Sequence, residues 1–145
     1  MIMNKEKTEY CYCLWIDTEE EHPDIVTDMT GISPTSKRVK GEWKGGKSKP
    51  TAVWDQNVWE LKSEMYYADN EWDICDNFSS FIEVINSKEA EFVKAITRFK
   101  DAGIDIRCTT FDTYWVQFRM QHEIMLLLSR YNLVTYFSIL ILKPD

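Results

Sequence analysis

Alternation of apolar and polar side chains predicts several strands in this chain of 145 residues. The first run, from Tyr10 to Ile16, is apolar on both faces, which is typical of a strand in the interior of a sheet. Two more strands are predicted over Ser36–Lys44 and Ala52–Glu64, joined as a long hairpin by a loop rich in glycine and lysine. In the second of these strands, Trp59 and Leu61 are the residues expected in the core.

Helical periodicity dominates the middle of the chain. Apolar residues recur at steps of three and four over 74–85 and again over 92–99, which predicts two amphipathic helices separated by Asn86 and Ser87. We expect Gly103 to end the second helix, because glycine readily takes the left-handed conformation past a helix end. A shorter helix is predicted from Pro23 to Thr30, with Gly31 in the same terminating role.

The last third of the chain returns to extended segments around one helix. Strands are predicted over 104–110 and 113–120, followed by a helix over 121–131 and a closing strand over 134–142. Asn132 suits the turn after that helix. The closing strand is apolar on both faces, so we expect it to lie inside the sheet.

The order of elements predicts an α+β fold. It runs strand-helix-strand-strand, then two helices, then strand-strand-helix-strand, which indicates a mixed, largely antiparallel sheet with helices packed on one side. Two halves with a ferredoxin-like arrangement are consistent with this order. The length favours one domain over residues 1–145, and a domain of this size buries roughly 70% of the surface of its unfolded chain.

Three short motifs connect the chain to a known family. The turn Gly31–Pro34, the step Lys40-Gly41 and the segment Trp59–Ser63 resemble the family of the domain of unknown function 4279, and the order of the later elements fits it. The family is defined by turn and core residues. The resemblance therefore implies a fold and no activity, and it transfers no catalytic residues.

Charge is distributed unevenly. The net charge is -7, yet six of the 17 basic residues and one of the 24 acidic residues lie between positions 36 and 50, which leaves 11 basic and 23 acidic residues elsewhere. One interpretation is an edge hairpin whose lysines prevent pairing with other sheets. The other is an anion-binding site, for which the candidate ligands are His22, Lys40, Lys44 and Lys47.

No catalytic, metal-binding or cofactor-binding signature is present in the sequence. The phosphate-binding Gly-x-x-x-x-Gly-Lys-Ser/Thr pattern and the His-Glu-x-x-His pattern are both missing, and no serine lies in a Gly-x-Ser-x-Gly setting. Four acids at or near predicted strand ends are candidates for a carboxylate pair only if the fold brings them together: Asp17, Asp55, Asp105 and Asp112. We therefore predict no catalytic residue, no metal and no cofactor; a non-enzymatic role is favoured, and an enzyme that uses the lysine-rich hairpin stays open as the alternative.

The cysteines favour buried free thiols over a metal site or a disulfide. Cys11 and Cys13 are two positions apart on one strand, where side chains share a face but are poorly placed to bond to each other. Cys75 and Cys108 stand alone, so the two close pairs typical of a four-cysteine zinc site are missing. The expected role of these thiols is that of small hydrophobic side chains.

Acidity and aromatic residues together predict a protein-interaction module. Negative charge argues against nucleic acid and anionic membranes as partners and favours a basic protein. Our hypothesis is an acidic neutraliser, such as an immunity protein against a basic toxin domain; the alternatives are an anion-binding or small-molecule-binding domain that uses the lysine hairpin, and a homodimer. The ends carry no apparent targeting segment, which predicts a cytoplasmic protein. The candidate partner-binding residues are Trp43, Trp54, Tyr66, Tyr67 and Trp72.

Overall fold

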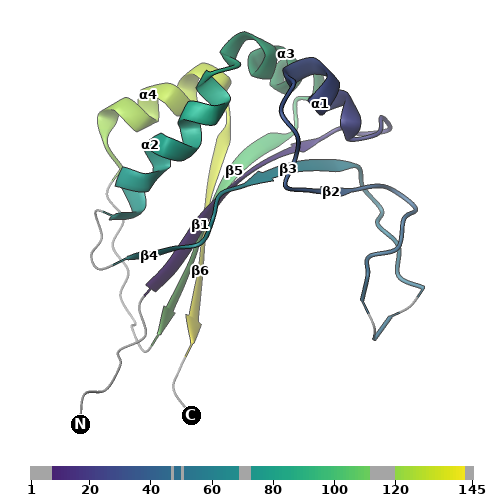
Figure 1. Ribbon diagram of the computed structural model, residues 1–145, viewed down its shortest axis with the longest axis horizontal. Helices are drawn as coiled ribbons and strands as arrows, with labels where there is room; N and C mark the ends of the chain where they lie inside the picture. Colours follow the sequence, from purple (N-terminus) through teal and green to yellow (C-terminus); the bar gives the residue numbers. More distant parts are fainter. Residues whose placement is uncertain (1–7, 47, 50, 69–72, 112–119, 143–145) are drawn as a thin grey trace.

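The described part of the protein consists of a six-stranded sheet covered by four helices (Figure 1). The computed structural model describes residues 8–46, 48–49, 51–68, 73–111 and 120–142. The elements in chain order are β1 (Thr8–Asp17), α1 (Asp24–Thr30), β2 (Ser36–Arg38), β3 (Val58–Lys62), β4 (Tyr66–Ala68), α2 (Asp73–Asn86), α3 (Glu89–Phe99), β5 (Ala102–Phe111), α4 (His122–Tyr131) and β6 (Val134–Leu142). The α+β class with a mixed, mainly antiparallel sheet is confirmed.

The sheet is ordered β2-β3-β1-β5-β6, with β4 paired to β1 beyond the end of β3. All described pairings are antiparallel except that of β5 with β6, which are parallel and connected through α4. Strand β1 lies at the centre, as its apolar composition predicted. Ser63 links β3 and β4 to β1, because its N–H donates to the Tyr12 carbonyl and its hydroxyl accepts from the Tyr12 N–H, both at 2.9 Å.

The core lies between the helices and one face of the sheet. Alternate residues of β1 and β5 point to this side, and β3 adds the fully buried Trp59. The helices contribute Phe81 and Phe99 among others, so the burial expected for these two residues is confirmed. All four helices lie on the same side of the sheet (Figure 1). The opposite face of β1, β3 and β5 therefore remains open, and it holds the polar members of each alternating pattern.

Helix ends follow the predicted chemistry in two cases and depart from it in one. Gly31 after α1 and Asn132 after α4 both have positive φ, as expected. Helix α3 ends earlier than predicted, at Phe99, and Lys100 takes the left-handed conformation with φ 65°. Gly103 lies instead within β5, where the indole of Trp15 covers it. The prediction for Gly103 was wrong because the close approach of a neighbouring side chain, and not a turn, requires a glycine there.

The predicted hairpin is shorter than the sequence indicated. Regular pairing is confined to β2 and β3, and beyond them the two arms meet only through the bridges of Lys40 with Trp54 and Trp43 with Val53. This connection projects away from the helices, beyond the sheet edge (Figure 1). Strand β4 follows β3 without having been predicted from the sequence, and its three residues pair with the start of β1.

Strand β6 differs most from its prediction. Its apolar composition predicted an interior position, but among the described strands it pairs only with β5 and forms the edge of the sheet. The apolar composition of a strand reflects how apolar its surroundings are, and the described strands supply such surroundings on one side of β6 only. The strand predicted over 113–120 lies outside the described residues except for its last position.

Candidate functional site

The open face of the sheet is hollowed beside β1. The hollow has a volume of about 400 Å³ and is lined by side chains from β1, β2, β3, β5 and β6 and from the turns at their ends. It is rich in charge, with four carboxylates and two guanidinium groups. The charged and aromatic lining residues are Trp15, Asp17, Arg38, Glu60, Asp101, Asp105, Arg107 and Tyr136.

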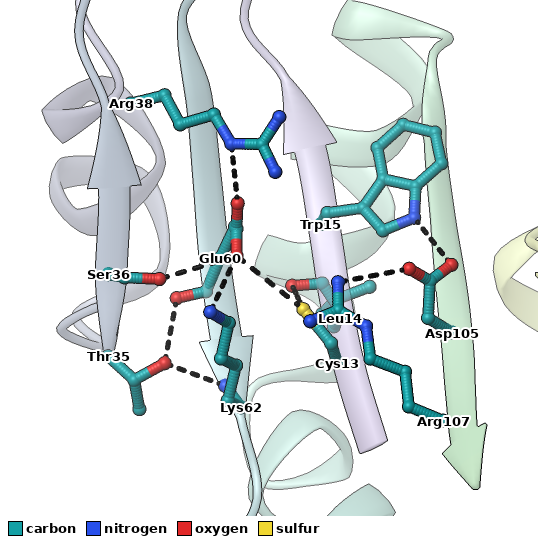
Figure 2. A network of polar contacts seen from close by, with 10 residues as sticks. All are labelled: Cys13, Leu14, Trp15, Thr35, Ser36, Arg38, Glu60, Lys62, Asp105 and Arg107. Atoms are coloured by element: carbon teal, nitrogen blue, oxygen red, sulfur yellow. Dashed lines mark hydrogen bonds and ion pairs between the residues drawn. The ribbon is translucent and has the colours of Figure 1, made fainter. Parts of the chain in front are cut away.

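A buried carboxylate organises one side of this hollow. Glu60 of β3 is 4% exposed, and strand alternation turns its side chain to the open face, opposite Trp59 and Leu61 in the core. Its Oε1 accepts from Arg38 Nε at 3.0 Å, and its Oε2 lies 3.3 Å from Lys62 Nζ. The hydroxyl of Ser36 donates to the same Oε2 at 3.3 Å. Figure 2 shows the two cations approaching Glu60 from opposite ends.

The second polar group of the hollow is built on β5. Asp105 accepts a hydrogen bond from the indole Nε1 of Trp15 at 3.2 Å, and its other oxygen is paired with Arg107 at 3.2 Å (Figure 2). The Trp15 ring lies over Gly103, where a Cβ would come within 2.7 Å of the indole. Tyr136 of β6 lies beside the indole, with 6.1 Å between ring centroids. The lack of a side chain at Gly103 thus lets an aromatic floor form in the hollow.

The thiols near the hollow are poor nucleophiles. Burial, together with the negative charge of Glu60, raises the pKa of Cys13 to about 12, and its thiol points to Glu60 Oε2 at 3.8 Å. Burial also raises the pKa of Cys11 and raises that of Cys108 to about 11. A catalytic cysteine needs a lowered pKa. These three free thiols are therefore protonated at neutral pH and act as packing groups, as the sequence predicted, while the side chain of Cys75 lies outside the described residues.

Two carboxylates at one end of the hollow lack a cation. Asp17 and Asp101 are adjacent, since the Asp17 N–H donates to the Asp101 carbonyl at 2.9 Å. The Asp17 side chain accepts only from the backbone N–H of Glu19, at 2.8 Å. Within the described part of the chain, neither carboxylate forms an ion pair, whereas Glu60 and Asp105 both do. The hollow therefore has an unneutralised acidic end next to its aromatic floor.

A family model gives the chain its place among known proteins. The model described as Domain of unknown function (DUF4279) matches residues 8–142. The chain belongs to this family. The match begins with the first residue of β1 and ends with the last residue of β6, so the DUF4279 domain includes the whole described sheet. No curated protein and no solved structure matches the chain.

Three of the four predicted anion ligands of this DUF4279 domain are described by the structure, and they lie outside the hollow. The imidazole Nδ1 of His22 accepts from the Asp24 N–H at 3.1 Å, Lys40 lies 3.4 Å from Glu20, and Lys44 lies over the Trp54 ring at 5.0 Å. Each is thus held by a different neighbour, and among the described residues no hydrogen bond or ion pair joins them. Lys47 lies outside the described residues. Anion binding by this set stays a prediction.

The predicted partner-binding aromatics have different surroundings. Trp43 and Tyr67 are well exposed, at 56% and 58%. Trp54 is half-buried beneath Arg38 and Lys44, and Tyr66 stacks on the core residue Tyr10. Trp72 lies outside the described residues. A role in partner binding therefore stays a prediction, best supported by exposure for Trp43 and Tyr67.

Sequence reasoning missed the site residues on the open face, with two exceptions. Asp17 and Asp105 were among the four inspected acids, and both line the hollow; Asp55 does not, and Asp112 lies outside the described residues. The pattern held a usable signal, because polar residues alternate with core residues at 17, at 60 and 62, and at 105 and 107. The pattern does not show which strands are neighbours in the sheet, and this information was missing.

Two further properties bear on function. Among the residues described, no three histidine, cysteine or acidic side chains are grouped closely enough to hold a metal ion. None of the helices in that part of the chain is both long and apolar enough to span a membrane.

Proposed function

We propose that this DUF4279 domain is a protein-interaction module whose open sheet face binds a basic segment of a protein partner. The observation that supports it most is the acidic end of the hollow beside the Trp15 and Tyr136 rings, where Asp17 and Asp101 have no ion-pair partner among the residues that the structure describes. A lysine or arginine side chain entering there gains two carboxylates, and its aliphatic stem gains an aromatic surface.

The charges of the hollow favour a cationic ligand over an anionic one. Four carboxylates and two guanidinium groups leave an excess of two negative charges, and the guanidinium groups are already paired with Glu60 and Asp105. An anionic ligand would have to displace those pairs, whereas a cation at Asp17 and Asp101 displaces none. The overall charge of -7 adds long-range attraction for a basic partner and makes association sensitive to salt.

An immunity protein that neutralises a basic toxin domain is the specific form of this function that we propose. Neutralisation requires a surface that captures a basic protein quickly, and an acidic face provides electrostatic steering. The exposed rings of Trp43 and Tyr67 supply further contacts of the kind enriched at interfaces.

The test compares two variants of equal charge. Asp17→Asn/Asp101→Asn removes the acidic end, and Asp28→Asn/Asp55→Asn removes two exposed carboxylates that do not line the hollow. A short arginine–serine peptide is titrated into each full chain by calorimetry at low and moderate salt, with a glutamate–serine peptide as the reference ligand. We expect the dissociation constant of the arginine peptide to be about tenfold higher for the first variant and to change less than about twofold for the second.

Two outcomes would contradict the proposal. Equal losses in both variants would mean that only the net charge attracts the peptide. Binding of the glutamate peptide in preference to the arginine peptide would support the lysine hairpin as an anion site instead. The same variants then test any basic protein partner that is found, and toxin neutralisation is measured with that partner.

A further inference from the structure

Strand β6 lies at the edge of the sheet but has the composition of an interior strand. Its seven large apolar side chains keep 41–56% of their surface exposed, on both faces of the strand. Among the described strands it pairs with β5 alone. Edge strands of monomeric proteins normally carry lysine, proline or inward-pointing charges that prevent further pairing. From Val134 to Leu142, β6 contains none of these residues.

We propose that two copies of this chain pair through β6, antiparallel, with a two-fold axis at Ser138. Ser138 is the midpoint of Val134–Leu142, so this register pairs all nine residues of each strand. It places Tyr136 opposite Leu140 of the second copy on the open face, and Phe137 opposite Ile139 on the helix side. Aromatic and aliphatic side chains facing each other across strands stabilise a sheet by about 0.2–1 kcal/mol per pair.

The exposed area is sufficient for a specific dimer. With about 150–250 Å² for each large side chain, the seven exposed fractions leave roughly 600 Å² on one copy. Two copies together bring about 1,200 Å², the lower end of specific protein interfaces, before the backbone of the strand edge is counted. A two-fold interface uses the same patch on both copies, so β6 of each copy supplies up to half of this area.

Charge distinguishes this interface from the proposed partner site. The strand carries no charged residue, although each chain carries a net charge of -7. Added salt screens the repulsion between two like-charged chains, so it should strengthen the dimer or leave it unchanged. Salt should weaken a basic partner at Asp17 and Asp101. Tyr136 and Ser138 belong to both surfaces, but the opposite salt dependence lets the dimer and the proposed function fail separately.

The test uses opposite charges at the axis. In Ser138→Lys two lysines would face each other, and in Ser138→Glu two glutamates would; each should raise the dimer dissociation constant about tenfold or more. Mixing the two variants in equal amounts places lysine opposite glutamate, so the dimer should return. Ser129→Lys on α4, an exposed serine outside β6, is the matched control. The full chain is measured by sedimentation over a range of concentrations and two salt levels, with circular dichroism to verify folding.

The expected result is a species of twice 17.2 kDa for the natural sequence and for Ser129→Lys, monomers for each Ser138 variant, and a dimer for their mixture. A monomer at all concentrations overturns the proposal, and it means that β6 is covered from within the chain or by a different protein. A dimer that Ser138→Lys weakens no more than Ser129→Lys does, or that mixing fails to restore, overturns it as well, since the contact then lies elsewhere.

Discussion

Replacing Glu60 by glutamine removes the charge that organises the open face while keeping the shape of the side chain. The carboxylate is 5% exposed, and it accepts from Arg38 at 3.0 Å, from Ser36 at 3.3 Å and from Lys62 at 3.3 Å. A glutamine retains one oxygen acceptor but presents an N–H₂ group where the other oxygen stood. One cation therefore faces a donor in place of an acceptor, and both lose their counter-charge.

The expected loss of stability depends on how deeply the carboxylate and its two cations are buried. Breaking a fully buried ion pair costs about 3–5 kcal/mol because a charge is left without a partner in the interior. Arg38 and Lys62 are each 39% exposed, so water solvates the abandoned cations and reduces this figure. We expect Glu60→Gln to lower the free energy of unfolding by about 1–2 kcal/mol, which corresponds to about 3–8 °C in Tm. Glu60→Ala should cost more, since it also leaves a cavity.

Urea denaturation followed by circular dichroism measures this difference. The control is Glu42→Gln, the same substitution at an exposed glutamate of the β2–β3 connection. A double-mutant cycle with Arg38→Gln isolates the pair, and its coupling energy should be about 0.5–1.5 kcal/mol. If Glu60→Gln and Glu42→Gln agree within about 0.5 kcal/mol, Glu60 does not hold this face together and the assignment is wrong.

Three further results are expected. Gly103→Ala should displace the Trp15 indole, because its Cβ would lie 2.7 Å from that ring, and it should lower the free energy of unfolding by about 1–3 kcal/mol in the same assay; an unchanged value would show that the ring moves aside without cost. Phe99→Ala should cost about 3–5 kcal/mol, since this ring is 2% exposed, and a loss under about 1 kcal/mol would contradict its place in the core. The pKa of Cys13 is raised from 9.0 to about 12, so the protonated thiol stabilises the fold fully below pH 9 and this contribution is lost as the pH rises toward 12. Native Cys13 should therefore resist alkylation at pH 8.5 that modifies the unfolded chain, and rapid native modification would refute that pKa.

The sequence was sufficient to predict most helices and strands, but not the residues at which they end. Periodicity located β1 and all four helices, because each has one continuous apolar face against the core. It failed where a tertiary contact decides the local structure. Lys100 ends α3 although lysine has no special preference for positive φ, and Gly103 serves the packing of Trp15. Strand β4 has only three residues and depends on pairing with β1, which no local pattern reports.

The site was harder to predict than the fold for a related reason. Glu60 stands between Trp59 and Leu61, so the sequence shows a polar residue on the far face of a strand and nothing more. Its role arises because β2 brings Arg38 to it and β1 brings Cys13. The neighbours of a strand come from strand order, and one sequence does not contain that order. The hairpin lysines, together with His22 before α1, were predicted as ligands because they stand out in the sequence.

The ion pairs of the hairpin explain why its positive charge is a poor indicator of an anion-binding site. Lys37 donates to Asp24 at 2.8 Å, which holds the pKa of this carboxyl below its ordinary value, and Lys40 lies 3.4 Å from Glu20. The basic hairpin is thus matched by acids of its own chain near α1. These pairs are exposed and each contributes little to stability, but an incoming anion must still compete with both carboxylates. At Asp17 and Asp101 an incoming cation meets no competing cationic side chain among the described residues, and this is why we propose the acidic body of the protein, and not its basic hairpin, as the binding site.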